Sequence, residues 1–193
     1  MCLISDTSLR EQVFREGEFE FARKLFERGD WDSIDGRILI YPFDAKNLGL
    51  FSYDLTVGNE AYMVAPRQKV SIEDEKEVII KPDDVSLILT QEFIGLPKIY
   101  AGFVMPRFCF VREGVMQSMT KIDPTWFGKI VVAIINHSRK QIKIKKGKAF
   151  CSLVIQKLDK PCSRNLNPHD TPSLGKESIE YFLKIKKTQR CLR

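Results

Sequence analysis

The sequence contains no apolar run long enough to cross a membrane and no cysteine pair at a metal-binding spacing. A spanning helix needs about 20 mainly apolar residues, and the N-terminus is polar and soon acidic, unlike a signal peptide. The five cysteines are an odd number without a Cys-x-x-Cys pair, so neither a disulfide framework nor a zinc site is expected. These absences predict an intracellular, cytoplasmic protein with no membrane partner.

Histidine is also scarce, and no internal repeat or long low-complexity segment is present. His137 and His169 have no ligand partner at a useful spacing, so neither is expected to bind a metal. The 193 residues are 44% hydrophobic, which is enough for one compact domain with a core. Charged residues make up 29% of the chain and are well mixed, so wholesale disorder is not expected.

The charge that is present is unbalanced, with a net value of +6. A basic balance favours anionic partners such as nucleotides, nucleic acid or acidic protein surfaces. The alternative is an ordinary solvated face, which is the commoner meaning of a basic run. Much of the excess lies in the last third of the chain, at Arg139, Lys140, Lys143, Lys145, Lys146, Lys148, Lys184, Lys186, Lys187, Arg190 and Arg193.

The first 35 residues are predicted to form an N-terminal helical segment. Apolar side chains between Ser5 and Arg28 recur near one helical face, with charged residues opposite. Gly17 divides this region into two short helices, and Gly29-Asp30 is a plausible stop. The simplest role for these helices is to cover one face of a sheet.

Strand periodicity begins at Arg37 and predicts a mainly β domain over residues 36–160. Many short strands separated by turn signals favour an all-β sandwich or barrel. Gly58-Asn59 is expected to close the second strand, and residues 161–193 are expected to be a basic C-terminal tail with one late helix or strand. The segments expected as strands are 37–41, 51–57, 62–65, 69–72, 77–81, 85–90, 99–105, 129–135, 141–145 and 149–156.

Four local motifs, in order along the chain, resemble the dCTP deaminase family of the trimeric dUTPase superfamily. Residues 36–43 are similar to that family's opening strand, and residues 52–58 (Ser-Tyr-Asp-Leu-Thr-Val-Gly) to its Ser-x-Asp-Leu-x-x-Gly element. Lys81-Pro82 followed by residues 87–97 resembles its Lys-Pro…Leu-x-x-Thr-x-Glu…Leu-Pro segment, and residues 122–128 its Ile-Asp-Pro turn. The resemblance covers about residues 34–158.

The resemblance implies a distorted jelly roll or β-barrel, a homotrimer, and active sites shared between subunits. It also implies a deoxynucleoside triphosphate ligand accompanied by Mg²⁺. Asp54 corresponds to the superfamily's early aspartate, which in dUTPases is linked to the phosphate-bound magnesium. Tyr181, Lys187 and Gln189 correspond poorly to the tail that family members fold over the triphosphate, so a solvated basic tail is the alternative.

The first departure from the family pattern lies at residues 107–114. Family members have Arg-Ser-Ser-x-x-Arg-x-Gly, whereas this chain keeps Arg107 and Arg112 but replaces both serines, with Phe108 and Cys109. Small hydroxyl side chains suit phosphate because they donate hydrogen bonds and let backbone N–H groups approach. Each lost hydrogen bond to a charged group costs about 1.5–3 kcal/mol. The two arginines are predicted to contact phosphate, with a structural ion pair from Arg112 to Glu113 as the alternative. The predicted nucleotide- or phosphate-binding residues are Arg107, Phe108, Cys109, Arg112, Asp123, Val131, Val132 and Ala133.

The second departure concerns the strand after the Asp-Pro turn. In the deaminases this strand carries a glutamate that activates the attacking water, and the alignment through Val131 and Val132 places Ala133 there. An alanine cannot move a proton, and general acid–base catalysis contributes about 10²–10⁴-fold. Asp123 is the best surviving candidate for chemistry, although Asp before Pro is also a favoured turn residue. Trp126 is expected to pack rather than to stack on a base.

Three hypotheses follow from these residues. The first is a pseudoenzyme that binds a nucleotide or phosphate and acts as a regulator, a sequestering protein or an assembly unit. The second is an active enzyme, either a dUTPase-like pyrophosphatase using Asp123, Asp54, Arg107 and Arg112 or a dCTP deaminase. The third is a nucleic-acid or protein binding module that uses the basic hairpin at residues 139–148.

Overall fold

The computed structural model describes residues 2–72, 77–165 and 179–180, and strands dominate them. The helical elements are α1 (Asp6–Gln12), η1 (Glu16–Glu18), α2 (Phe19–Arg28), α3 (Trp31–Ile34), η2 (Ala45–Asn47) and α5 (Phe108–Arg112). The strands are β1 (Cys2–Leu3), β2 (Leu39–Tyr41), β3 (Tyr53–Met63), β4 (Gln68–Ser71), β5 (Glu77–Ile80), β6 (Val85–Gly95), β7 (Tyr100–Pro106), β8 (Val115–Gln117), β9 (Thr120–Ile122), β10 (Phe127–Asn136), β11 (Ile142–Lys145) and β12 (Ala149–Lys157).

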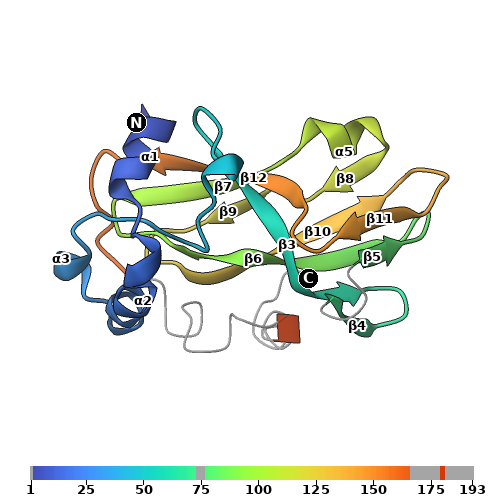
Figure 1. The fold of residues 1–193 in the computed structure, drawn as a ribbon, viewed down its shortest axis with the longest axis horizontal. Coiled ribbons are helices and arrows are strands. Elements are labelled where there is room, and N and C mark those ends of the chain that lie inside the picture. The colour runs from blue at the N-terminus through green and yellow to red at the C-terminus, as the bar shows by residue number, and fades with distance from the viewer. Residues whose placement is uncertain (1, 73–76, 166–178, 181–193) are drawn as a thin grey trace.

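The predicted N-terminal helices are confirmed, and they gather at one end of the molecule (Figure 1). Ser5 caps α1 by accepting a hydrogen bond from the Ser8 N–H at 3.3 Å. Gly29 ends α2 in the left-handed region, at φ 66°, as the sequence predicted. Between the two helices, Gly17 lies in the short η1 turn. Aromatic side chains from these helices form a second, smaller core against the sheet. In it, the rings of Phe26 and Phe127 stack with their centroids 5.7 Å apart.

Ten strands form one curled antiparallel sheet around the main core. The order along it is β8-β10-β6-β3-β12-β7-β9, with β1 beside β12, β2 beside β6 and β4 beside β3. A separate two-stranded sheet joins β5 to β11 at the end of the molecule opposite α1–α3 (Figure 1). Alternate side chains of the long strands point inward, so residues such as Val132 and Ile134 on β10 are fully buried. The mainly β class is confirmed.

The expected turn at Gly58-Asn59 is wrong, because β3 continues without a break to Met63. The pairing of β3 with β6 shifts register between Val57 and Ala61, which marks a β-bulge. A Cβ atom on Gly58 would lie 2.6 Å from the Thr90 carbonyl oxygen. Glycine is therefore required here for a close approach of two backbones inside the sheet, not for a chain reversal.

The segment between Pro106 and Phe127, for which no strand was predicted, contains regular structure. It contains the short helix α5 and the three-residue strands β8 and β9. These strands lie at the two ends of the curled sheet, β8 beside β10 and β9 beside β7. Such short elements carry too few residues for a periodic pattern, so their periodicity could not predict them.

The predicted late helix or strand and most of the predicted tail fall outside the described residues. The same is true of His169, Tyr181, Lys187 and Gln189. Among the helices that the structure describes, none is long and apolar enough to cross a membrane.

Candidate functional site

Two of the predicted ligand-binding residues, Arg107 and Asp54, are paired with each other. Arg107 follows the end of β7, and its Nη1 donates to the Oδ2 of Asp54 on β3. The hydroxyl of Ser152, which lies opposite Asp54 on β12, donates to the Oδ1 atom at 2.6 Å. Both carboxylate oxygens of Asp54 are therefore engaged, and the positive charge of Arg107 is balanced within the chain.

The backbone of Arg107 is fixed by a buried amide that the sequence did not point to. Gln117 on β8 accepts a hydrogen bond from the Arg107 N–H at 3.1 Å through its Oε1 atom. Its Nε2 donates to the carbonyl oxygen of Phe150 on β12. Gln117 thus ties the β7–α5 junction to the neighbouring strand β12, and it lies in a segment for which no strand was predicted.

Most side chains of α5 point outward, although Phe110 packs against the main core. Phe108 is 76% exposed, and Cys109 and Arg112 are exposed as well. Arg112 lies 3.5 Å from Glu113, but both side chains are about two-thirds exposed (67% and 64%). An ion pair of this kind contributes little to stability because water screens it. Arg112 is therefore the predicted cation that remains open to a ligand.

Ala133 lies on β10 with its methyl group on the outer face of the sheet. Val131 shares that face and is likewise only partly buried, whereas Val132 points into the core. The neighbouring residue is Ser118, whose hydroxyl accepts from the Ala133 N–H at 3.1 Å and whose N–H donates to the Ala133 carbonyl at 2.9 Å. On the other side, Ala133 is paired with Leu87 of β6.

Asp123 follows β9, and its carboxylate accepts from the Lys121 ammonium at 2.5 and 2.6 Å. The register of β7 and β9 pairs Gly102 with Ile122, so Asp123 is level with Ala101. Arg107 is six residues further along β7, which is about 20 Å at the rise of an extended strand. Within one chain, Asp123 and Arg107 therefore do not meet, whereas Asp54 and Arg107 do.

A buried carboxylate does exist in the fold, but it lies in the core. Glu92 on β6 accepts from the Thr56 N–H at 2.9 Å and from the Thr56 hydroxyl at 2.7 Å. Burial raises the pKa of Glu92, while the two hydrogen bonds from Thr56 act in the opposite direction. Glu92 lies five residues along β6 from Leu87, the partner of Ala133. It therefore does not lie at the position where the family resemblance implies a glutamate.

The described residues do not form a resident metal site. They contain no group of three or more His, Cys, Asp or Glu side chains that could hold an ion. Direct coordination by Asp54 would have to displace Arg107 and Ser152, and a metal would also face the guanidinium charge. The prediction that Asp54 contacts Mg²⁺ through water thus stays a prediction, and no chemical step is assigned to the ion.

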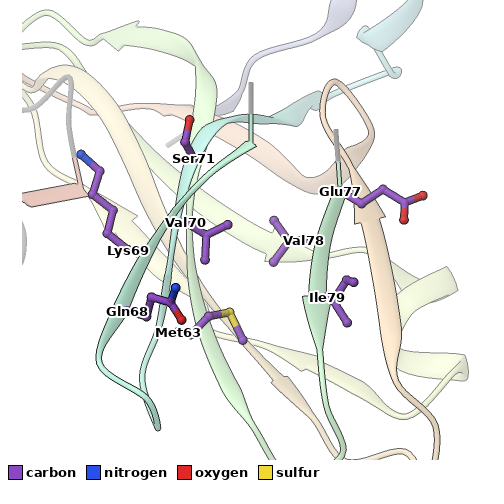
Figure 2. Close-up of a pocket in the computed structure, with 8 residues that line it drawn as sticks. All are labelled: Met63, Gln68, Lys69, Val70, Ser71, Glu77, Val78 and Ile79. Atoms are coloured by element: carbon purple, nitrogen blue, oxygen red, sulfur yellow. The ribbon is translucent and has the colours of Figure 1, made fainter. Parts of the chain in front are cut away.

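A groove of about 440 Å³ opens between β4 and β5, away from every predicted site residue (Figure 2). Met63, Val70 and Val78 form its apolar part, and Lys69 and Glu77 are among its polar residues. Lys69 is already paired with Glu60 at 3.1 Å and Glu180 at 3.4 Å. None of these residues matches a family motif.

Comparison with known proteins agrees with the motifs. The family model described as dCTP deaminase-like matches residues 31–158, about two-thirds of the chain. The chain belongs to the dCTP deaminase-like family. The dCTP deaminase of Pyrococcus horikoshii is 35% identical over 132 residues, covering 68% of this chain and 83% of that protein. The dCTP deaminase of Pyrococcus abyssi is 36% identical over 140 residues, covering 72% and 87%.

A solved structure extends the likeness of this dCTP deaminase-like chain to the fold. The 2′-deoxycytidine 5′-triphosphate deaminase of Agrobacterium tumefaciens superposes with a TM-score of 0.57 at 15% sequence identity. The match covers 81% of this chain and 49% of that protein, so the chain spans about half of its length. The family model and the curated relatives confirm the predicted family, and this structure shows that the overall fold is shared.

The buried carboxyl of this dCTP deaminase-like fold makes its stability depend on pH. Since the pKa of Glu92 is raised in the folded state, the native protein binds the proton more tightly than the unfolded chain. The contribution of Glu92 to stability is complete below the ordinary value of 4.5 and is lost as the pH rises through the folded-state pKa. We expect Glu92→Gln to flatten the decrease of the unfolding free energy over that window.

Urea denaturation at a series of pH values measures the effect. Glu11→Gln, which changes an exposed carboxylate on α1, is the matched control and should follow the wild type. Identical pH profiles for Glu92→Gln and the wild type would contradict the prediction.

Proposed function

We propose that the chain is a dCTP deaminase-like protein that binds a deoxynucleoside triphosphate or a related phosphate ligand without deaminating it. The observation that carries the proposal is the residue at position 133. The strand and its pairing with β6 are those of an intact sheet, yet a methyl group stands where the family resemblance requires a carboxylate. Directly after β8, the neutral hydroxyl of Ser118 accepts a hydrogen bond from the Ala133 N–H.

The phosphate-binding part of the proposal rests on the two arginines. Arg112 is exposed on α5 and has only a screened contact with Glu113. Arg107 is bound to Asp54, so a phosphate group must compete with that carboxylate for it. With the two serines replaced by Phe108 and Cys109, we expect weaker binding than in an enzyme that keeps them.

The site is proposed to be completed between subunits of a homotrimer. Measured along β7, Arg107 lies about 20 Å from the position beside Asp123. This distance supports the arrangement, because a single chain keeps Asp123 and Arg107 apart. The outer face around Ala133 is also apolar, with Val131 beside it and Met116 half-exposed on β8. An apolar outer face of this kind suits contact with another subunit.

Ligand binding is tested by thermal shift and calorimetry with dCTP and dUTP, each with Mg²⁺. We expect a rise in the melting temperature, since a ligand at 100 times its Kd stabilises the folded state by about 2.7 kcal/mol. Arg112→Ala should weaken binding at least tenfold, equivalent to about 1.4 kcal/mol. Light scattering on the same sample gives the mass of the assembly.

The control for this experiment is Arg10→Ala, which removes an exposed arginine from α1 at the other end of the molecule. It should bind as tightly as the wild type. Absence of any shift with every nucleotide would contradict the binding proposal. Magnesium-dependent release of pyrophosphate from dUTP that Asp123→Asn abolishes would instead favour the pyrophosphatase, although the pairing of Asp123 with Lys121 does not favour it.

A further inference from the structure

The two-stranded sheet of β5 and β11 has one buried face and one basic face. Val78, Ile80 and Ile144 point into the core and are almost completely buried. On the outer face, Lys143 and Lys145 are exposed. The connections on either side of β11 add further exposed cations. The resulting cluster, here named the basic ribbon, consists of Arg139, Lys140, Lys143, Lys145, Lys146 and Lys148.

Among the residues that the structure describes, the cations of the basic ribbon have almost no acidic partner. Glu77 is the only acidic residue on the two strands, and its Oε2 atom lies 3.9 Å from Lys143 Nζ, a long contact. No carboxylate of the described residues lies within 4.0 Å of the other five. Elsewhere, by contrast, Lys69, Arg107 and Lys121 each have a carboxylate partner. Among the described side chains of β5, β11 and the connections of β11, positive charge is therefore in excess.

The chemistry of the basic ribbon suits a dense polyanion. A nucleic-acid duplex carries one negative charge per about 1.7 Å of its axis. A four-residue strand spans about 13 Å, so β11 alone can face about eight such charges. A two-stranded ribbon also has a width that the major groove of DNA admits.

The composition of the basic ribbon indicates contact with the backbone rather than with bases. Five of its six cations are lysines, which act as point charges and do not read base edges by a fixed fork geometry. Residues 139–148 contain no aromatic side chain on which an unpaired base could stack. A single strand would therefore gain little beyond charge, whereas a duplex offers twice the charge density.

We propose that the basic ribbon binds the phosphate backbone of a nucleic-acid duplex independently of its sequence. The surface contains none of the residues assigned to nucleotide binding, so the two proposals stand or fall separately. The full chain is titrated into fluorescent 20-base-pair duplexes of unrelated sequence, as DNA and as RNA, and into the single strands. Anisotropy is measured between 50 and 200 mM salt.

We expect equal affinity for duplexes of different sequence and weaker binding to single strands. With about five phosphate contacts, the slope of log K against log salt should be about −4 to −5. The DNA and RNA arms show which duplex is preferred, and binding of either supports the proposal. The double variant Lys143→Gln/Lys145→Gln should reduce the magnitude of the slope by about 2 and weaken binding at 100 mM salt by about tenfold or more.

The matched control is Lys24→Gln/Arg28→Gln, which removes two exposed cations from α2 at the opposite end of the molecule. It lowers the net charge by the same amount and should bind nearly as the wild type does. No binding at 50 mM salt, or an equal loss in both double variants, would overturn the proposal. Competition by polyglutamate as strong as that by DNA would also overturn it, in favour of an acidic protein partner.

Discussion

Incubation of the purified chain with dCTP is expected to release no ammonia above the uncatalysed background. Deamination requires a group that moves a proton from the attacking water toward the ring, and Ala133 has none. General acid–base catalysis alone contributes about 10²–10⁴-fold. The buried carboxyl that the fold does contain, Glu92, is held in the core by Thr56 and lies away from this position. A continuous ammonia assay at high protein concentration measures the effect.

Restoring the missing groups should reveal how much of the site is left. Ala133→Glu places a carboxylate on the outer face of β10, and combining it with Phe108→Ser and Cys109→Ser restores the small donors on α5. We expect turnover of dCTP at least 10²-fold above background in the triple variant. Ala133→Glu alone should show a lower turnover, because it still lacks the two serine hydroxyls that would donate to phosphate.

Ala133→Gln in the same background is the control, since glutamine has a similar size but no titratable proton. It should remain inactive. Turnover by the wild-type chain at a rate comparable with the triple variant would refute the non-deaminating assignment. Turnover by the glutamine variant would show that the carboxylate is not the group that limits catalysis.

Replacement of Asn136 by alanine is expected to reduce the unfolding free energy by about 3 kcal/mol or more. Asn136 is fully buried at the end of β10, and its Nδ2 donates to the carbonyl oxygens of Ile80 at 3.0 Å and Lys140 at 2.8 Å. Its Oδ1 accepts from the Ser138 N–H at 3.0 Å and the Ser138 hydroxyl at 2.6 Å. A buried polar group left without a partner costs about 1–3 kcal/mol. The substitution removes the partner of the Ile80 and Lys140 carbonyl oxygens and of the Ser138 N–H and hydroxyl at the same time.

Urea denaturation gives this free energy, and Ser138→Ala provides the comparison. That variant removes one hydroxyl from the same network while Asn136 keeps both of its donor bonds, so we expect a loss of about 1 kcal/mol. A midpoint for Asn136→Ala equal to that of the wild type would contradict the prediction. Equal losses in the two variants would show that the turn, rather than the buried amide, provides the stability.

The local patterns of the sequence were sufficient for the elements that are long enough to repeat. Helical spacing predicted α1 and α2 with their boundaries near Gly17 and Gly29, because apolar side chains recur on one face in every helical turn. The alternation of apolar and charged residues predicted β11, in which isoleucines alternate with lysines. The motifs around Asp54 and Asp123 predicted the family, which the comparisons confirmed.

The contacts of the candidate site depended on the tertiary structure. Arg107 and Asp54 are separated by 53 positions and Asp54 and Ser152 by 98, so no local pattern could show that they are paired. Gly58 looked like a turn residue because the reason for it, the Thr90 carbonyl on another strand, is far away in sequence.

The sequence by itself determined the family and the mainly β class, and it led to the prediction that Ala133 stands at the position of the family's glutamate. Only the tertiary structure decided that Asp54 forms an ion pair with Arg107 and that Glu92 is buried in the core. It also decided that Asp123 lies beside the start of β7, at the end remote from Arg107. The physical reason is that residue identity and periodicity are local properties. Burial, pairing and the distance between charges, in contrast, arise only when strands remote in the chain are brought into register.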